Sequence, residues 1–387
     1  MRIAVCGAGI AGLSFACAAA RRGSKVILLE KAPAPRRQGY MMDFFGPGYD
    51  AAEALGLVPK LSRLDHHIAG VRYVDRSGRR RATLDFGPLV RQRNTRLLNV
   101  TRAELELVLR ESLQASVEIR FSTTITAIDQ DAAGVNLRLS SGQSLGVDLL
   151  VGADGIHSRV RALTFGDESR YMRRLDLDFV AFTFPDAETR STLGNWYCTT
   201  DSIGASLSLY ALDEDKVGVF GFHSGIDAQL SLSAALETAY GHLGWLVPRV
   251  LSHVPAPDAI YEDVVAQIVL PDWSRDRVVL IGDACHAVSP LGGQGAGLAV
   301  AGGFVLAKEL AEQPTIEAAL RAYENRWRPE VASVQRAARK LGPWFVPRDR
   351  FHLLARRLAL NMAALPGVRD VVGGLVVGRP SPAMRTQ

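Results

Sequence analysis

The first thirty residues alternate between apolar runs and one stretch of helical periodicity. Residues 2–6 are a short apolar run that predicts a buried strand. Apolar residues then recur at helical spacing from residue 10 to residue 20, and Gly23 ends this predicted helix. Residues 25–30 are a second apolar run of the parallel, buried type. The pattern predicts a βαβ unit with a right-handed crossover.

Strand and helix patterns continue to about residue 152. Thr101 and Glu104 have the spacing of a capping box, which opens a helix whose apolar residues share one face. Residues 117–140 predict short antiparallel strands, because apolar and polar positions alternate there. Residues 148–152 predict another buried strand.

From about residue 171 to residue 265 the alternation of apolar and polar positions dominates. The stretches 206–210 and 217–222 are typical of antiparallel strands with one buried face. We expect a mostly antiparallel sheet that forms one wall of a substrate cavity, although ordinary sheet core explains any single residue equally well. The aromatic candidates for this wall are Trp196, Tyr197 and Tyr210.

The final part of the chain has a helical pattern. Residues 298–310 predict one helix, and residues 315–341 predict a longer helix with a kink at Pro329. A last helical segment is expected at about 350–365. No internal repeat or low-complexity segment interrupts these elements.

Two glycine-rich loops follow hydrophobic strands at opposite ends of the chain. The first is Gly7–Gly12, and Glu30 ends the next strand, where a dinucleotide fingerprint needs a carboxylate for a ribose hydroxyl. The second, within residues 277–297, contains a buried strand, an acidic Gly-Asp turn and a glycine-rich loop. Such loops place free backbone N–H groups and a helix N-terminus near a ligand's negative charge. We therefore expect one large dinucleotide held from both ends.

Arg102 is a further candidate for anion binding. It stands at the N-terminus of a predicted helix, which already favours negative charge. Alone, it would be interpreted as a surface arginine near a helix cap. Beside two dinucleotide loops, we favour a role in binding the anionic ligand.

Composition narrows the class of protein. The chain has 387 residues, of which 48% are hydrophobic and 22% charged, and a net charge of +5, as in an ordinary soluble enzyme of one or two domains. The basic residues late in the chain favour a solvated face, and no aromatic residues interleave with them as in nucleic-acid binding. The four cysteines form no C-x-x-C pair, which argues against disulfides and zinc and favours a reducing, cytoplasmic compartment.

The apolar N-terminus superficially resembles a signal peptide. Its regularly spaced glycines and the strand that follows favour folded protein instead. No apolar run is long enough to span a membrane. We expect no metal site, no membrane span, and a monomer or weak dimer.

In chain order, these motifs resemble the class A flavoprotein monooxygenases, with the fold of para-hydroxybenzoate hydroxylase, over roughly residues 1–340. The resemblance rests on the loop GAGIAG, Glu30, Arg102, the segment 152–159 (GADGIHSR) and the segment 281–290 (IGDACHAVSP). It implies an α/β fold with a Rossmann-like FAD-binding domain, an inserted, mostly antiparallel β-sheet substrate domain and C-terminal helices. The implied FAD-binding parts are residues 1–72, 92–170 and 266–345, the substrate domain is 73–91 and 171–265, and 346–387 is a helical C-terminal segment.

The same resemblance implies non-covalent FAD, with NADH or NADPH as co-substrate. The first loop would bind the pyrophosphate, and Glu30 would bind the adenosine ribose. Asp283 would bind the ribityl chain, and residues 290–297 would line the isoalloxazine. Within the family, residues 36–43 look most like the tetracycline-inactivating monooxygenases, which implies a flavin contact for Asp43, an NADPH contact for Arg36 and antibiotic modification as an activity. The implied cofactor contacts are Gly7, Gly9, Ala11, Gly12, Glu30, Lys31, Arg36, Asp43, Arg102, Asp154, Gly282, Asp283, Pro290, Gly293, Gly295 and Ala296.

Two features depart from the family pattern. The second loop ends at Gly297, where many relatives carry asparagine, and the following helix has Gly302 and Gly303 in place of an acidic pair. Neither change removes backbone N–H donors, so flavin binding is still expected, while its fine tuning is in doubt.

The implied reaction is hydroxylation of a hydrophobic, aromatic or polycyclic small molecule by O2 through a C4a-hydroperoxyflavin. No side-chain acid, base or nucleophile is required, and a structural role is favoured for His286. The main alternative is a flavin-dependent reductase or dehydrogenase without oxygen insertion. A nicotinamide-only dehydrogenase would leave the second loop unused, a halogenase lacks its Trp-x-Trp-x-Ile-Pro motif, and a non-catalytic binding protein fits least.

Overall fold

The predicted βαβ unit lies at the centre of a six-stranded sheet with the order β17-β18-β11-β1-β2-β7. Neighbouring strands are parallel except at β17, which is antiparallel to β18. The strands are β1 (Arg2–Cys6), β2 (Lys25–Leu29), β7 (Glu118–Arg120), β11 (Leu149–Gly152), β17 (Ser274–Arg275) and β18 (Val278–Leu280). This computed structural model describes residues 1–35, 39–93, 96–131, 133–213, 215–225 and 230–362.

Strand β7 corrects the prediction that residues 117–140 are all antiparallel. It pairs in parallel with β2, at the edge of the six-stranded sheet. Only β8 (Ile125–Gln130) and β9 (Val135–Leu139), joined by β10 (Ser144–Val147), form the expected antiparallel sheet. An edge strand of a parallel sheet is half-exposed and shows the same alternation of polar and apolar residues. The pattern alone therefore could not give its direction.

A seven-stranded sheet with the order β16-β12-β15-β14-β13-β4-β5 confirms the expected antiparallel region. Its neighbours are antiparallel except for the parallel pair of β13 and β4. Side chains of α7 (Ala187–Leu193), α8 (Leu232–Tyr240) and α9 (Val247–Leu251) share one apolar core with it. The strands are β4 (Gly70–Val74), β5 (Arg80–Asp85), β12 (Met172–Pro185), β13 (Trp196–Ser202), β14 (Ala205–Ala211), β15 (Lys216–His223) and β16 (Tyr261–Ile268).

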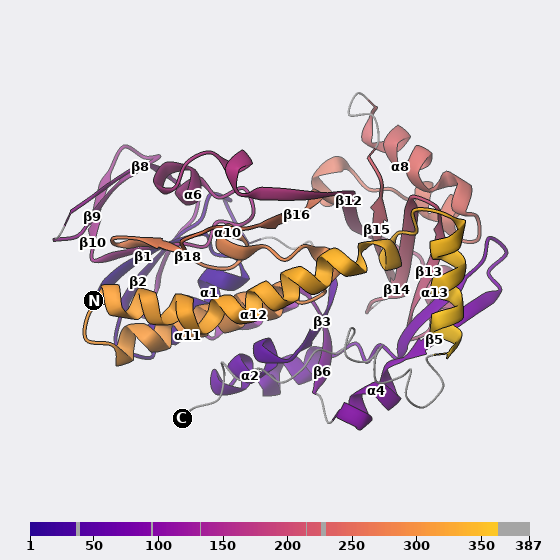
Figure 1. The fold of residues 1–387 in the computed structure, drawn as a ribbon, viewed down its shortest axis with the longest axis horizontal. Helices are drawn as coiled ribbons and strands as arrows, with labels where there is room; N and C mark the ends of the chain where they lie inside the picture. The colour runs from indigo at the N-terminus through magenta and orange to yellow at the C-terminus, as the bar shows by residue number, and fades with distance from the viewer. Residues whose placement is uncertain (36–38, 94–95, 132, 214, 226–229, 363–387) are drawn as a thin grey trace.

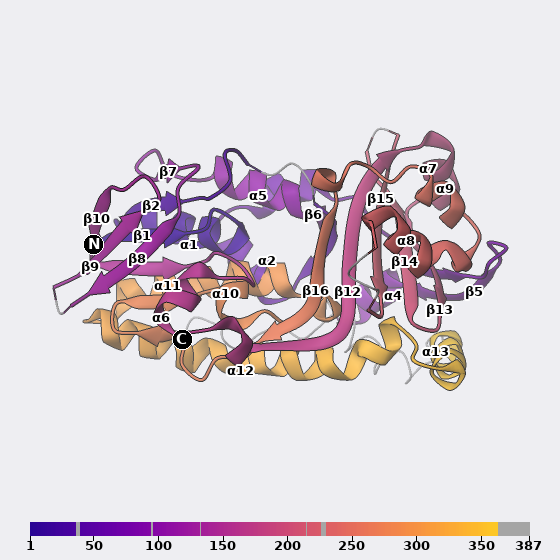
Figure 2. The same cartoon turned by 90° about the horizontal axis from the view of Figure 1, so that it is seen from above.

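Between the two large sheets lies a two-stranded sheet of β3 (Met41–Phe45) and β6 (Leu97–Thr101). Within the seven-stranded sheet, strands β16 and β12 lie on the side nearest the six-stranded sheet (Figure 2). The proposed domain boundaries remain a prediction. In the seven-stranded sheet, β4 begins at Gly70 and β16 ends at Ile268. The boundaries at 72 and 265 therefore fall inside these two strands.

Helices cover the six-stranded sheet. Helix α1 (Ile10–Ala20) packs between α5 (Arg102–Glu111) and α11 (Gly295–Glu312), and α11 packs against α12 (Ile316–Phe345). Helix α11 begins three residues earlier than predicted, and α12 continues through Pro329. Helix α12 runs from the six-stranded sheet to the seven-stranded sheet, where α13 (Arg350–Met362) follows (Figure 1). Within the described ranges, no helix is both long and apolar enough to cross a membrane.

Candidate cofactor site

Two glycines of the first loop are packed against backbone atoms. Gly7 has a φ of +105°, and a Cβ there would lie 2.4 Å from the carbonyl oxygen of Ala153. A Cβ on Gly12 would lie 2.0 Å from the carbonyl oxygen of Gly7. Neither position has room for a side chain. The loop and the start of α1 are therefore held in place by direct packing of backbone against backbone.

Gly9, between these two glycines, faces open space. The nearest atoms to a Cβ there are Nη2 of Arg102 and Oε1 of Glu106, both 3.9 Å away. Arg102 is the first residue of α5 and forms an ion pair of 3.1 Å with Glu106. The predicted capping box between Thr101 and Glu104 is present. The open side of the loop therefore faces a guanidinium and the N-terminus of a helix, both of which favour an anion.

Glu30 ties the first loop to the end of β2. Its Oε2 accepts a hydrogen bond from the N–H of Ala8 at 2.8 Å, and its Oε1 accepts one from Ala32 at 2.9 Å. Each carboxylate oxygen has two lone pairs, so Glu30 can still accept a hydrogen bond from a ribose hydroxyl. Lys31, the next residue, is exposed.

The second motif meets the first loop at Gly282. Gly282 has a φ of +59°, and a Cβ there would lie 2.6 Å from the Cβ of Ala11. Asp283 follows as the first residue of α10 (Asp283–His286), and its side chain is exposed. Burial nevertheless raises the pKa of the Asp283 carboxyl group, and the charge of Arg102 opposes that shift. The carboxylate of Asp283 is thus accessible to solvent although protein atoms surround it.

The second glycine loop leaves space in front of a helix N-terminus. Gly293 has a φ of +60°, and no described atom lies within 4 Å of a Cβ there. The nearest atom to a Cβ on Gly295 is 3.9 Å away. Helix α11 begins at Gly295, and its N-cap residue Gln294 makes no side-chain hydrogen bond to it. The first N–H groups, including that of Ala296, thus lack a side-chain cap and favour an electron-rich ligand edge.

The two glycines that replace the family's acidic pair have packing roles. A Cβ on Gly303 would lie 2.9 Å from the backbone nitrogen of Phe15 in α1. A Cβ on Gly302 would lie 2.8 Å from Nε1 of Trp327 in α12. These glycines let α11 lie close to both neighbouring helices.

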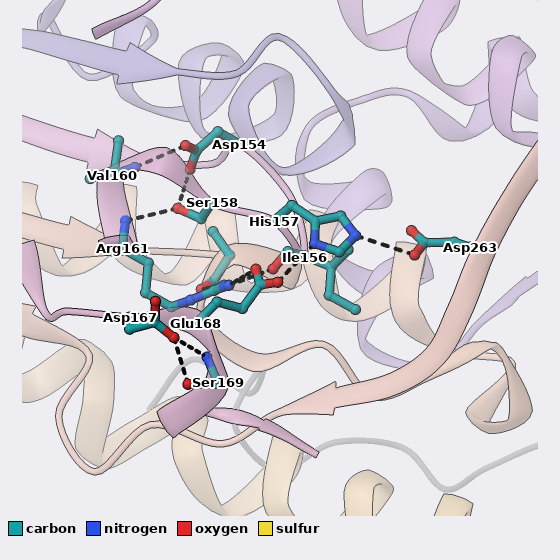
Figure 3. Close-up of polar contacts among 11 residues, drawn as sticks. Asp154, Ile156, His157, Ser158, Val160, Arg161, Asp167, Glu168, Ser169 and Asp263 are labelled. Carbon is teal, nitrogen blue, oxygen red and sulfur yellow. Dashed lines mark hydrogen bonds and ion pairs between the residues drawn. The ribbon is translucent and has the colours of Figure 1, made fainter. Parts of the chain in front are cut away.

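Asp154 shapes the loop between β11 and α6 (Arg159–Thr164), as Figure 3 shows. Its Oδ1 accepts a hydrogen bond from the Ser158 hydroxyl at 2.5 Å, and its Oδ2 accepts one from the N–H of Val160 at 3.0 Å. Burial raises the pKa of Asp154, and these bonds oppose that shift. Both oxygens thus have partners within the protein, and the contact of Asp154 with the cofactor remains a prediction.

Arg161 is a buried residue of this region that sequence reasoning missed. Its guanidinium donates to the carbonyl oxygens of Ala284 at 2.9 Å and Ile156 at 2.6 Å, and to Glu168 at 2.5 Å (Figure 3). Ala284 belongs to the second motif, so Arg161 ties that motif to the Asp-Gly loop. No sequence signal separates Arg161 from the exposed Arg159.

Asp43 links β3 to the seven-stranded sheet. Its Oδ1 accepts hydrogen bonds from Nδ2 of Asn99 at 2.7 Å and from the Tyr197 hydroxyl at 3.2 Å. Burial raises the pKa of Asp43 to about 6, although both hydrogen bonds oppose that shift. Its contact with the flavin remains a prediction, and Arg36 lies outside the described residues.

His286 is buried behind the second motif. Its ring centroid lies 5.0 Å from that of Trp273. Burial lowers the pKa of His286 to about 4, so the imidazole is neutral at pH 7. This environment supports a structural role over that of a base.

Aromatic side chains gather where the seven-stranded sheet approaches the second loop. We call the group Tyr40, Phe179, Phe220, Phe222 and Tyr261 the aromatic surface. The ring centroid of Phe179 lies 5.1 Å from those of Tyr40 and Phe222 and 5.9 Å from that of Tyr261. Leu291, from the second loop, belongs to the same apolar cluster.

Two of the three aromatic residues expected in the cavity wall adjoin this surface. Tyr197 and Tyr210 have ring centroids 5.9 Å and 6.1 Å from that of Phe220. Trp196 instead packs against Arg72, whose Cζ lies 4.0 Å from the centroid of the Trp196 ring. The sequence pattern located the correct strands, but it did not show which aromatic side chains share one face.

The expectation of no metal remains a prediction. In the described part of the chain, donor atoms of His66, Glu104 and Asp213 all lie within 4.8 Å of one another. Glu104 already serves the capping box of α5, and Oε1 of Glu104 lies 3.1 Å from His66 Nε2. This group is explained by helix capping and an ion pair.

Residues 1–338 match the FAD binding domain family. The chain belongs to this family. The flavin-dependent monooxygenase of Legionella longbeachae is 28% identical over 315 residues, which cover 80% of each chain. An arginine-to-glutamine variant of Klebsiella pneumoniae HpxO, solved with FAD, is 25% identical, with a TM-score of 0.82 over 97% of this chain and 98% of that one.

The tetracycline destructase Tet(51) shares the fold, with a TM-score of 0.79, 24% identity and coverage of 97% of this chain and 98% of that one. The expected fold and the resemblance to class A flavoprotein monooxygenases are confirmed. The protein is an FAD-dependent monooxygenase.

Proposed function

We propose that this FAD-dependent monooxygenase consumes NADH or NADPH and O2 to hydroxylate a hydrophobic small molecule, aromatic or polycyclic. The observation that carries the proposal is the aromatic surface. Phe179 and Phe222 are buried at its centre, whereas the rings of Tyr40, Phe220 and Tyr261 are partly exposed and offer flat apolar area. Leu291 joins this cluster to the second glycine loop. A flat apolar substrate would therefore lie beside the loop that receives the flavin ring.

The residues present fit non-covalent FAD. The positions of Gly9 and Gly295 leave room beside backbone N–H groups, and the side chain of Asp283, directly after Gly282, is exposed. Arg102 supplies positive charge near the pyrophosphate, and Glu30 can accept a hydrogen bond from the adenosine ribose. The other residues expected to contact FAD are Gly7, Ala11, Gly12, Lys31, Asp43, Asp154, Gly282, Pro290, Gly293 and Ala296.

When bound, FAD supplies hydride acceptance and oxygen activation. The protein's own groups control the surroundings. The uncapped N-terminus of α11 favours negative charge on the adjacent ring edge. The aromatic surface excludes water from the reaction. Burial raises the pKa of Asp43 to about 6, so its carboxyl group can take up a proton in mildly acidic solution.

The nicotinamide has no second dinucleotide fingerprint in this sequence. We infer that it docks transiently at the flavin, and Arg36 is the proposed contact. The buried, free cysteines at 6, 17, 198 and 285 support a cytoplasmic location, and a monomer or weak dimer is proposed. The fold shared with Tet(51) makes a polycyclic antibiotic one substrate class to test.

Labelled oxygen gas tests the proposal. Purified protein is incubated with NADPH or NADH, a panel of aromatic and polycyclic compounds and ¹⁸O2, and the products are analysed by mass spectrometry. One heavy oxygen atom in the product is expected. Conversion of substrate under strict anaerobiosis, with no oxygen gained, would make the enzyme a reductase or dehydrogenase instead.

A further inference from the structure

Two buried glutamine side chains hold the backbone that leads into the second glycine loop. Gln267, in β16, donates from Nε2 to the carbonyl oxygens of Val288 at 3.2 Å and Gln335 at 3.0 Å. Gln335, in α12, donates from Nε2 to the carbonyl oxygens of Ala287 at 3.0 Å and Ile268 at 2.8 Å. The side chains are buried, with exposed fractions of 0% for Gln267 and 7% for Gln335.

Arg339 completes this arrangement. Its Nη1 donates to Oε1 of Gln267 at 2.7 Å, so that the Gln267 amide has partners on both its nitrogen and its oxygen. Arg339 lies one helical turn after Gln335 on α12. Side chains from one helix and one strand thus fix two successive carbonyl groups of a third segment. We call Gln267, Gln335 and Arg339 the amide clamp.

The segment held by the amide clamp ends in a strained residue. Ser289 has a φ of +74° and a ψ of 153°, a conformation that L-residues rarely adopt. Its hydroxyl is buried and has no hydrogen-bond partner among the described residues. Such a conformation persists only where the surrounding structure enforces it. The carbonyl of Val288, directly before Ser289, is one of the two that the clamp holds.

Helix α12 also supports the loop itself from behind. A Cβ on Gly292 would lie 3.4 Å from Cγ1 of Val334 and 3.6 Å from Cβ of Ala338. At its far end, α12 carries Phe345, whose ring centroid lies 6.0 Å from that of Phe222 on the aromatic surface. One helix therefore contacts both the loop and the proposed substrate wall.

We propose that Gln267 and Gln335 are positioning residues, which hold the second glycine loop in the geometry that receives the flavin ring. The inference rests on the proposed placement of FAD over this loop. Without the amide donors, the Val288 carbonyl loses its side-chain partner and the Ala287 carbonyl keeps the N–H of Ile268, so Ser289 can relax from its positive φ. The N–H groups at the start of α11 then turn away from the flavin. Loss of the amide clamp therefore changes the surroundings of the flavin as well as the stability of the fold.

The test replaces each amide by an apolar side chain of similar length. Gln335→Met and Gln267→Met remove the donors, and Gln313→Met is the matched control, because its Nε2 donates to Glu309 at the far end of α11. We expect both clamp variants to bind FAD roughly tenfold more weakly and to shift its visible absorption bands. The control should keep the wild-type affinity and spectrum, which are measured on reconstituted holoenzyme.

Wild-type FAD affinity and spectrum in both folded clamp variants would overturn the inference. If a clamp variant fails to fold, the same two measurements are made on Arg339→Met, which removes the hydrogen bond to Oε1 of Gln267 and keeps both glutamines. A smaller shift in the same direction would support the inference, and an unchanged spectrum would overturn it. Both readouts use the resting holoenzyme. A wild type that binds FAD but inserts no oxygen would therefore contradict the proposed function alone.

Discussion

The two glycine loops are alike in sequence and different in packing. In the first loop, a side chain on Gly7 or Gly12 would meet backbone atoms at 2.4 Å or 2.0 Å. In the second loop, a Cβ on Gly293 would meet no described atom within 4 Å, and one on Gly295 would meet its nearest at 3.9 Å. Gly9 resembles the second group, although it lies in the first loop.

This difference separates two physical uses of glycine. Closed glycines let one stretch of backbone lie against another, and they fix where the loop stands. Open glycines leave a volume beside N–H groups, which a ligand can fill. Substitutions at closed positions should therefore damage the fold, and so should one at Gly293, because its φ of +60° disfavours a side chain. Substitutions at Gly9 and Gly295 should damage only the binding of FAD.

The largest expected effect is at a closed position. Gly12→Ala places a Cβ 2.0 Å from the carbonyl oxygen of Gly7, which no rotamer change can relieve. We expect a loss of about 3 kcal/mol or more in the free energy of unfolding of the apo-protein. Gly9→Ala, with a φ of −83°, should change it by less than about 1 kcal/mol. Urea denaturation measures both, and equal losses would remove the distinction between the two kinds of glycine.

A substitution of Asp283 tests the proposed binding site of the ribityl chain. Asp283→Ala removes the acceptor proposed for the ribityl hydroxyls and should weaken FAD binding by about 1–3 kcal/mol, or roughly 5–150-fold. Asp272→Ala, an exposed carboxylate that precedes β18 in sequence, serves as the control. Fluorescence titration gives both dissociation constants. Unchanged affinity in folded Asp283→Ala would place the flavin elsewhere.

The pH dependence of stability separates His286, buried behind the second motif, from Asp43, which links β3 to the seven-stranded sheet. The pKa of buried His286 is lowered to about 4, so its contribution to stability is lost as pH falls from about 6.5 towards 4. The pKa of Asp43 is raised to about 6, so its contribution is lost as pH rises from about 4 towards 6. Each effect is at most about 3 kcal/mol, because one pKa step corresponds to about 1.4 kcal/mol.

Two variants isolate these opposed contributions. Relative to the wild type, His286→Gln should gain stability as the pH falls through this window, whereas Asp43→Asn should gain stability as the pH rises. Thermal unfolding from pH 4 to pH 7 shows the sign of each slope. Parallel slopes in wild type and variant would mean that folding does not shift the pKa of the residue.

The βαβ unit and Glu30 could be predicted because their signals are local. Strand, glycine turn, helix and acid occupy thirty consecutive residues, and periodicity alone separates them. The capping box at Thr101 is equally local, and the structure confirms it. The second motif was recognisable for the same reason, since strand, turn and helix follow one another directly.

Contacts between distant segments could not be predicted. Arg161 and Ala284 are 123 residues apart, and Asp43 and Tyr197 are 154 residues apart. Nothing in one segment indicates the carbonyl or hydroxyl that the other supplies. The direction of β7 was missed for a related reason, because its partner β2 is far away in sequence.

Titrations of FAD and ADP into apo-protein test most directly that one dinucleotide spans both loops. ADP carries only the adenosine and pyrophosphate half. We expect Gly9→Ala to weaken both ligands about fivefold, on the order of 1 kcal/mol, and Gly295→Ala to weaken FAD by a similar factor while leaving ADP unchanged. If Gly295→Ala weakens ADP as much as FAD, or if neither variant affects FAD, the two loops do not hold the two ends of one FAD molecule.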